Sequence, residues 1–189
     1  MELSEAISLI QNEHFSTKNS TEWADLGCGS GLFTFALAQL LQPGSTVFAV
    51  DKEPVRLDMR LKPEDIKVLP LQLDFIAEGL PFKQLDGILM GNSLHYVRDK
   101  MLLFKRLSSF LKPGGHFLIV EYDTDTPVSH WVPYPVSFES LKRLFENAEF
   151  SSLQKLGERA SVFGRANLYA ALARQTSARL KNTVGMESF

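Results

Sequence analysis

The sequence has one cysteine, four histidines and almost no excess charge of either sign. Cys28 has no partner for an internal disulfide, and without a CxxC pair or a Cys/His cluster we expect no metal site. Lys and Arg total 20 against 22 for Asp and Glu, which gives no basic field for nucleic acid or an anionic membrane. No apolar run approaches about 18 residues, the length of a membrane span. These absences predict a protein of the reducing cytoplasm that binds neither nucleic acid nor membrane.

The length and apolar content of the chain predict a single domain. With 189 residues, 44% of them hydrophobic, it can fill a core without disulfides. We assign residues 1–174 to this domain, which forms a monomer or a homodimer. Within residues 1–20 an apolar stripe predicts a helix that could serve as a lid. Residues 175–189 are polar and weakly patterned, so we expect a flexible tail.

Strand and helix patterns alternate along the chain. Strands are expected at 22–26, 46–50, 67–73, 85–90, 116–122, 150–156 and 162–173. Helices are expected at 32–41, from Pro54, at 100–111 after a cap at Asp99, and at 137–147. Alternation predicts a parallel sheet with helices on both faces, but five residues between the last two strands allow only an antiparallel hairpin. The fold class is therefore α/β, a Rossmann-like doubly wound sheet with six parallel strands and one antiparallel strand.

A glycine-rich turn follows the first predicted strand, with Asp25, Gly27, Cys28, Gly29 and Gly31 in the stretch DLGCGSG. Glycines let the backbone bend sharply and approach a ligand closely, at the edge where open α/β sheets bind ligands. A dinucleotide loop, G-x-G-x-x-G, requires glycine at position 32, where this chain has leucine. The acid and the G-x-G-x-G spacing predict a different nucleoside cofactor.

The stretch WADLGCGSGLFTFALA resembles the cofactor loop of the class I S-adenosylmethionine (SAM)-dependent methyltransferases. The resemblance extends over about residues 22–173, because the family shares the strand order and terminal hairpin expected here, and LKPGGHFLIVEYD at 111–123 resembles its turn into the fifth strand. It implies SAM as cofactor, S-adenosylhomocysteine as product and a small-molecule methyl acceptor.

Two acids after later strands extend the resemblance to the rest of the cofactor. Asp51 ends the second strand, 24 residues after Gly27, and corresponds to the family's ribose-binding acid; Lys52 follows it. NAD enzymes place an acid at a similar offset, so Asp51 does not distinguish the two cofactors. Asp74 and Phe75 follow the third strand and resemble the family's adenine pocket, although Asp74 could equally cap a helix.

The segment after the fourth strand, GNSLHY, lies at the edge that faces cofactor and acceptor in this family. Gly91 and Asn92 are assigned to the cofactor site. The segment lacks the Asn/Asp-Pro-Pro-aromatic motif of DNA and protein amide methyltransferases, which disfavours those substrates. His95 could act as a general base, because its reference pKa of about 6.5 suits neutral pH, or could only line the cofactor or bond to backbone.

Aromatic and acidic residues near strand ends are candidates for the acceptor site: Tyr96, Glu121, Tyr122, Trp131 and Tyr134. Two other classes of function remain open at this point. One is a non-catalytic SAM-binding module that acts through a partner protein. The other is an NAD-dependent oxidoreductase, which the leucine at position 32 and the terminal hairpin argue against.

Overall fold

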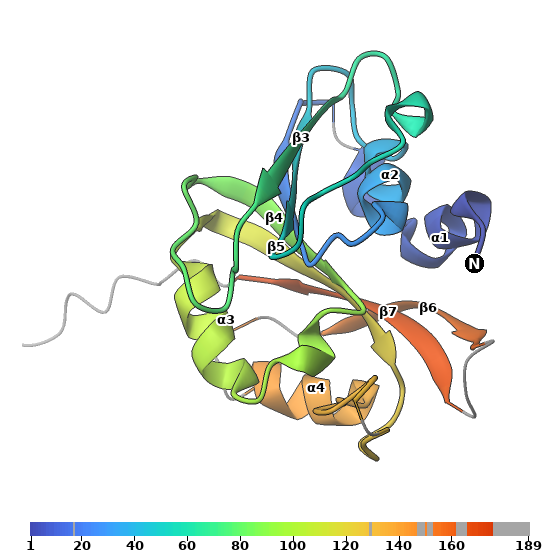
Figure 1. The fold of residues 1–189 in the computed structure, drawn as a ribbon, viewed down its shortest axis with the longest axis vertical. Helices are drawn as coiled ribbons and strands as arrows, with labels where there is room; N and C mark the ends of the chain where they lie inside the picture. The colour runs from blue at the N-terminus through green and yellow to red at the C-terminus, as the bar shows by residue number, and fades with distance from the viewer. Residues whose placement is uncertain (17, 129, 147–149, 151–152, 162–165, 176–189) are drawn as a thin grey trace, which may run out of the picture.

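The computed structural model describes residues 1–16, 18–128, 130–146, 150, 153–161 and 166–175, which form one seven-stranded sheet (Figure 1). The strands are β1 (Glu22–Leu26), β2 (Thr46–Asp51), β3 (Lys67–Gln72), β4 (Leu85–Gly91), β5 (Leu111–Tyr122), β6 (Gln154–Ala160) and β7 (Asn167–Arg174), in the spatial order β3-β2-β1-β4-β5-β7-β6. Strand β7 pairs antiparallel with both β5 and β6, and the other pairings are parallel. The predicted sheet of six parallel strands and one antiparallel strand is confirmed.

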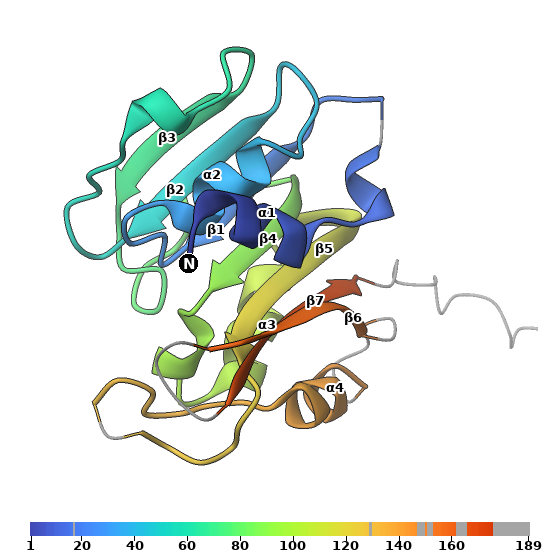
Figure 2. The same ribbon diagram turned by 90° about the vertical axis from the view of Figure 1, so that its right-hand side faces the viewer.

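In the part of the chain that the structure describes, four α-helices cover the two faces of the sheet (Figure 2). On one face α1 (Leu3–Ile10) packs on α2 (Leu32–Ala38), and on the other lie α3 (Lys100–Ser108) and α4 (Phe138–Glu146). Each pair encloses its own apolar core against the strands, one including Phe35 and Trp23 and the other Phe104 and Phe145. Among the described residues, no helix has the length and apolarity to cross a bilayer.

Local sequence signals explain where the helices begin. Asp99 accepts a hydrogen bond from the Leu102 backbone N–H at 2.9 Å, so it caps α3 as predicted. Helix α2 begins directly after Gly31, and six of its seven residues are buried, which explains its continuous apolar sequence. Both helices end about three residues before the predicted boundary, in short turns.

The helix predicted from Pro54 is wrong. The chain is irregular there, and only a short 3₁₀ turn, Met59–Leu61, follows. Val55 and Leu57 are half-buried in the core, whereas Arg56 between them is exposed. Alternation of half-buried and exposed side chains at every second residue is typical of an extended segment. In a helix, Val55 and Leu57 would point in different directions.

The C-terminal hairpin forms as predicted, but its strands are displaced along the chain. Strand β6 begins at Gln154 instead of residue 150, with a register shift between Lys155 and Gly157. Gly157 lies so close to α1 that an added Cβ would be 2.9 Å from the Leu9 carbonyl oxygen. Residues 162–165, predicted to begin the last strand, and 176–189, most of the predicted tail, lie outside the described residues. Gln175 donates from its backbone N–H to the Gly115 carbonyl at 2.8 Å.

Strand β5 begins five residues before the predicted position, at Leu111. Its pairing with β4 jumps from Leu85–Leu111 to Gly87–His116. Gly114 has φ +80° in this bulge, so the Pro-Gly-Gly turn predicted from the sequence is present, but as an interruption within the strand.

Candidate functional site

The turn from β1 into α2 exposes its backbone because three glycines adopt positive φ: Gly27, Gly29 and Gly31. A Cβ on Gly27 would lie 2.5 Å from the Ser93 Cβ, and one on Gly31 would lie 2.5 Å from the Leu57 Cδ2. Residues with side chains are strained at such φ values, and at Gly27 and Gly31 they would also collide with their neighbours, whereas a Cβ on Gly29 would meet nothing within 4 Å. The spacing of the glycines is therefore set by local geometry, and the turn forms one wall of a cleft.

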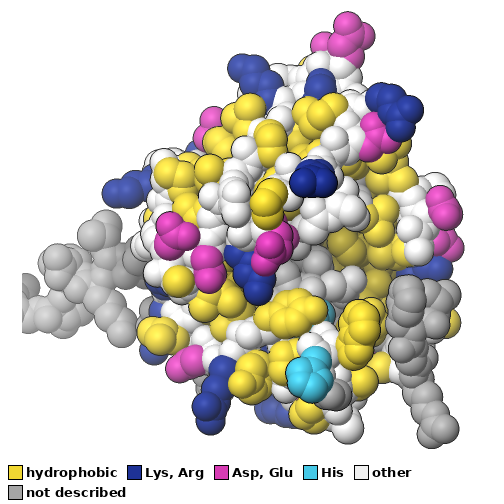
Figure 3. Space-filling model, in the orientation of Figure 1, with side chains coloured by type: hydrophobic (Ala, Val, Ile, Leu, Met, Phe, Trp, Pro, Cys, Tyr) yellow, Lys and Arg dark blue, Asp and Glu magenta, His cyan; other side chains and the backbone are white. Residues whose placement is uncertain are grey.

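The cleft has a volume of about 750 Å³ and lies at the carboxyl ends of β1, β2 and β4. The predicted site residues that line it are Asp25, Gly27, Cys28, Gly29, Asp51, Lys52, Asp74, Phe75, Gly91, Asn92 and Tyr96. Figure 3 shows a hollow near the middle of the face that carries these strand ends, with hydrophobic side chains on its border. Eleven positions separated by up to 71 residues in sequence are thus brought to one concavity.

Asp51 ends β2 and ties the glycine turn to the next segment. Its Oδ2 accepts from the Gly29 backbone N–H at 2.9 Å, and its Oδ1 accepts from the Glu53 backbone N–H at 3.0 Å. A carboxylate offers about four acceptor positions, so each oxygen keeps capacity for a second donor. Asp51 thus shapes the turn and still presents a charged acceptor to the cleft.

Asp25 is a buried acid on the floor of the cleft, with 1% of its surface exposed. Its Oδ2 accepts from the Thr34 hydroxyl at 2.5 Å, but its buried Oδ1 has no hydrogen-bond partner among the described residues. Burial raises the pKa of this carboxyl to about 7, although the Thr34 hydrogen bond acts in the opposite direction. A donor or a cation in the cleft would satisfy Oδ1 and favour the ionised form.

Asn92 adopts φ +55° directly after β4, where Gly91 packs under the Phe33 ring. Its backbone N–H donates to the Val120 carbonyl at 2.8 Å, which fixes the turn. The buried Asn92 Oδ1 has no partner in the described part of the chain. The residues that line the cleft thus include two with a buried oxygen acceptor that no other described residue satisfies, Asp25 and Asn92.

Asp74 and Phe75 follow β3, and Asp74 caps the next segment. Asp74 Oδ1 accepts from the backbone N–H groups of Ile76, at 2.9 Å, and Ala77, at 3.3 Å, so Asp74 does cap the following segment, which is a turn and not a helix. Phe75 is buried, with its ring 3.6 Å from the position of a Cβ on Gly27. Both residues still line the cleft.

His95 is 3% exposed and lies beside the cleft without being one of the residues that line it. Its Nδ1 is 2.7 Å from Glu121 Oε2, and its backbone N–H donates to Glu121 Oε1 at 3.0 Å. Its ring contacts Tyr96, which does line the cleft, with 4.3 Å between ring centroids. The structure thus joins His95, Glu121 and Tyr96 in one cluster.

The remaining acceptor-site candidates lie outside the lining of the cleft. Tyr122 is half-buried, with its ring centroid 6.2 Å from that of His95. Trp131 is 78% exposed, and Tyr134 is connected to the cluster by its backbone N–H, which donates to the His95 carbonyl at 2.9 Å. Lys100 donates to the carbonyls of Val97 and Tyr134, and its burial lowers its pKa.

The cleft also contains residues that the sequence did not single out: Ser30, Leu32, Phe33, Ile76 and Ser93. Ser93 donates from Oγ to the Leu26 carbonyl at 2.6 Å and packs against Gly27, so it joins the two strand ends. Ser93 directly follows Gly91 and Asn92 in the sequence, and this position could have identified it as a residue of the cleft. Burial raises the pKa of the Cys28 thiol, which argues against a nucleophile. Among the described residues, no cluster of His, Cys, Asp and Glu could hold a metal ion.

A family model described as "Methyltransferase domain" matches residues 24–117, about half of the chain. The chain is 30% identical over 131 residues to malonyl-(acyl-carrier protein) O-methyltransferase 2 of Ilyobacter polytropus, covering 67% of this chain and 46% of that protein. It is 28% identical over 155 residues to demethylmenaquinone methyltransferase of Bacillus cytotoxicus, covering 77% and 65%. The chain thus spans about half to two thirds of the length of these relatives.

The fold is also similar to a solved structure, 1,6-didemethyltoxoflavin-N1-methyltransferase of Burkholderia thailandensis with bound 1,6-didemethyltoxoflavin and S-adenosylhomocysteine. The TM-score is 0.63 at 21% identity, covering 92% of this chain and 78% of that one. Together with the sheet order and the glycine turn, these matches show that the chain belongs to the class I SAM-dependent methyltransferase family.

Proposed function

We propose that the protein uses SAM to methylate a small-molecule acceptor. The observation that carries this proposal is the pair of buried, unsatisfied acceptors in the cleft, Asp25 Oδ1 and Asn92 Oδ1. SAM carries an ammonium group and a sulfonium, so it brings donors and positive charge to a place where the protein supplies acceptors and an acid. A buried acceptor without a donor is costly, and a bound cation would remove that cost.

The other residues of the cleft fit the remaining parts of the cofactor. In this proposal the backbone at Gly27, Cys28 and Gly29 lies against the methionine part, with Gly91 and Asn92 across the cleft. Gly31, also predicted for this site, caps α2 and is not one of the residues that line the cleft. Asp51 accepts from the ribose hydroxyls with the capacity left on its two oxygens, and Lys52 borders the same part of the cleft. Asp74 accepts from the adenine amino group through Oδ2, and the buried Phe75 ring covers adenine.

Methyl transfer from SAM mainly requires that the protein align the acceptor with the methyl group. The methyl group of SAM is already activated, so the chain must hold the acceptor about 3 to 3.5 Å away and in line, and such positioning alone can supply about 7 to 11 kcal/mol. The exposed rings of Tyr96, Trp131 and Tyr134 are the proposed walls for a flat acceptor. The quinone substrate named for one relative and the toxoflavin precursor bound in the solved structure are acceptors of that shape.

His95 is the proposed general base for an acceptor hydroxyl or amine. The Glu121 carboxylate accepts from Nδ1–H, which leaves Nε2 as the nitrogen that can take a proton. We expect His95→Gln to lower turnover by about 100-fold or more, the range for loss of a general base, while affinity for S-adenosylhomocysteine stays within about twofold. Equal losses of turnover and affinity would mean that His95 only shapes the cleft.

Calorimetry and thermal shift with SAM, S-adenosylhomocysteine and NAD test the cofactor directly, because a ligand that binds the folded state raises Tm. We expect both adenosyl ligands to bind and NAD to have no effect. Radiolabelled SAM with a panel of quinols, phenols and nitrogen heterocycles then tests transfer. Stabilisation by NAD alone would overturn the proposal, and SAM binding without transfer to any acceptor would favour a non-catalytic binding module.

A further inference from the structure

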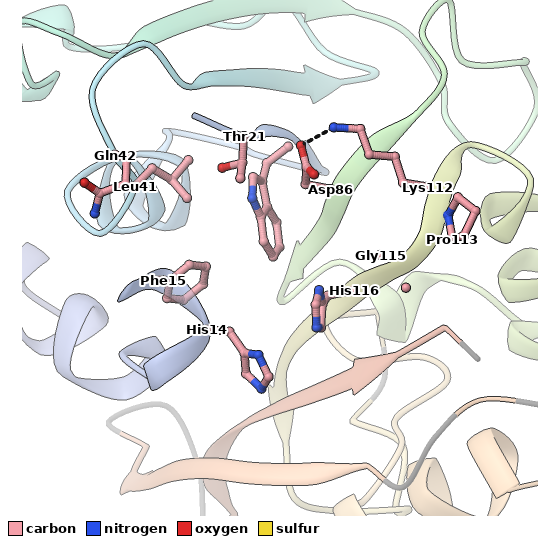
Figure 4. A pocket seen from close by; sticks show the side chains of 12 residues that line it. His14, Phe15, Thr21, Leu41, Gln42, Asp86, Lys112, Pro113, Gly115 and His116 are labelled. Carbon is pink, nitrogen blue, oxygen red and sulfur yellow. Dashed lines mark hydrogen bonds and ion pairs between the residues drawn. The ribbon is translucent and has the colours of Figure 1, made fainter. Parts of the chain in front are cut away.

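A second, smaller cavity lies at the opposite end of the sheet from the cleft. It has a volume of about 140 Å³ and is bordered by the amino ends of β1 and β4, the bulge of β5 and the 3₁₀ turn Glu13–Ser16 (Figure 4). We call it the amino-edge pocket and define it by His14, Phe15, Thr21, Trp23, Leu41 and His116. An apolar cavity of about 150 Å³ accommodates benzene, so this volume suits one small ring.

Three polar atoms of this pocket are buried without a hydrogen-bond partner among the described residues: Thr21 Oγ1, Trp23 Nε1 and His116 Nε2. Trp23 is only 4% exposed, and its ring covers Gly87, where a Cβ would lie 2.2 Å from the indole. Its Nε1–H can only donate, so burial without an acceptor is costly. Three such atoms in one pocket indicate a polar ligand and not a void filled by hydrocarbon.

Rings make up much of the wall. The His14 and His116 ring centroids are 5.0 Å apart, and those of Phe15 and Trp23 are 5.5 Å apart. Figure 4 shows His14, Phe15 and His116 grouped on one side of the pocket, with Leu41 and Thr21 above them. Aromatic surfaces stack favourably on planar molecules. The shape of the wall therefore favours a flat ligand over an extended chain.

Two charged side chains, Asp86 and Lys112, border the pocket. Asp86 Oδ2 is 2.8 Å from Lys112 Nζ and also accepts from the Glu22 backbone N–H at 2.8 Å, so these two opposite charges are paired. Burial, followed by the nearby His14 and Arg174, lowers the pKa of His116 to about 4, so its ring is neutral. Because Asp86 and Lys112 neutralise each other and the His116 ring is neutral, these residues favour an uncharged ligand.

We propose that the amino-edge pocket binds a small, uncharged heteroaromatic molecule with a hydrogen-bond acceptor next to a donor. The acceptor receives the Trp23 Nε1–H, and the donor bonds to His116 Nε2. The Thr21 hydroxyl can donate or accept and completes the set. This site shares no residue with the cleft, so it stands independently of the proposed methyl transfer.

The probe is 2-pyridone, a neutral six-membered ring whose carbonyl acceptor and N–H donor are adjacent. The chain has two tryptophans, so a ¹H–¹⁵N spectrum shows two indole signals, which a Trp131→Phe variant assigns. Trp131 is 78% exposed and belongs to the proposed acceptor wall, so its signal reports binding there and not in the amino-edge pocket. With saturating S-adenosylhomocysteine present, we expect 2-pyridone to shift the Trp23 signal saturably, and a shift of the Trp131 signal alone would overturn the proposal.

Two related molecules test the pattern of hydrogen bonds. N-methyl-2-pyridone keeps the acceptor but lacks the donor, so it should bind about tenfold more weakly, and benzene should bind more weakly still. The His116→Phe variant should bind 2-pyridone more weakly to a similar degree. If His116→Phe fails to fold, Thr21→Val provides a second variant for the same measurement. No shift of Trp23 up to the solubility limit, displacement by S-adenosylhomocysteine, or equal binding of benzene would each overturn the proposal.

Discussion

The two cavities lie at opposite ends of the same strands and differ in what they present. Strand β1 contributes Trp23 to the amino-edge pocket and Asp25 to the cleft, while β4 contributes Asp86 to the former and Gly91 to the latter. The cleft combines open glycine backbone with unsatisfied acceptors, whereas the pocket combines rings with a buried indole donor. At the carboxyl ends of the strands, glycine turns expose backbone to a ligand. At the amino ends, large side chains approach each other. The two ends of one sheet therefore suit ligands of different chemistry.

The largest expected effect comes from filling the glycine turn. Gly27→Ala introduces a Cβ 2.5 Å from the Ser93 Cβ at a φ of +81°. Left-handed strain costs about 1 to 2 kcal/mol and overpacking about 1 to 3, so we expect a loss of about 2 to 5 kcal/mol in the free energy of unfolding. Urea denaturation measures this loss, and calorimetry should show S-adenosylhomocysteine affinity reduced by more than about tenfold.

Gly79→Ala is the matched control, because a Cβ there meets nothing within 4 Å and the glycine does not have positive φ. It should leave both stability and affinity nearly unchanged. If Gly27→Ala behaved like Gly79→Ala, close approach of the backbone would not be what the cleft requires.

The next largest effect is expected at Asp51, the acid proposed to bind ribose, and not at acids outside the cleft. Asp51→Ala should weaken S-adenosylhomocysteine binding by about 1.5 to 3 kcal/mol, the value of hydrogen bonds to a charged group, or roughly 10- to 150-fold. Asp58→Ala removes an acid that bonds to Arg60 and does not line the cleft, so it should leave affinity unchanged. Unchanged affinity in a folded Asp51→Ala protein, measured by calorimetry, would reject the ribose assignment.

Asp25→Asn should change stability and binding in opposite directions. The pKa of Asp25 is raised from 3.8 to about 7, so between these pH values the native state binds more protons than the unfolded state, and stability falls as pH rises. At pH 8 the ligand-free variant should therefore gain about 1 kcal/mol or more, or about 2 to 4 °C in Tm.

The same variant loses the negative charge of a residue that lines the cleft, so under the proposed function its affinity for S-adenosylhomocysteine should fall about tenfold. Thermal melts at pH 5 and pH 8 with and without ligand measure both effects. The gain in Tm should shrink toward pH 5, where Asp25 is already protonated in the native state. A gain independent of pH would contradict the ionisation of Asp25 as its cause.

The smallest effect is expected at the amino-edge pocket. Thr21→Val keeps the shape of the side chain and removes a buried hydroxyl with no partner among the described residues, so stability should change by less than about 1 kcal/mol, with a gain favoured. Affinity for S-adenosylhomocysteine should stay within twofold by calorimetry. A large loss of that affinity would show that the two ends of the sheet are not independent.

Most of the sheet could be predicted from the sequence because buried strands and glycine turns carry local signals. The segments that were predicted wrongly depend on contacts with residues that are distant in the sequence. Val55 and Leu57 face a core made by other elements, so the segment after Pro54 is extended despite its helix-like start. The register shift in β6 depends on contact between Gly157 and Leu9, residues about 150 positions apart in the chain.

The cleft was predictable to the extent that its residues end strands or directly follow them, as Asp51 and Asn92 do. The hydrogen bond from Thr34 to Asp25 Oδ2 was not, because it depends on how α2 packs on β1. Nor could the sequence show that Glu121 holds His95, since the two are 26 residues apart on neighbouring strand ends. The amino-edge pocket has no motif at all, because single residues from several elements form it.

The position of β7 inside the sheet has a consequence for synthesis of the chain. Strand β7 lies between β5 and β6, so β6 has no partner until residues 167–174 have left the ribosome. Until then the apolar edge of β5 is open to other nascent chains, which is the condition under which partly made sheets aggregate. The order of strands thus makes closure of this edge of the sheet depend on β7, the last of its strands to be synthesised.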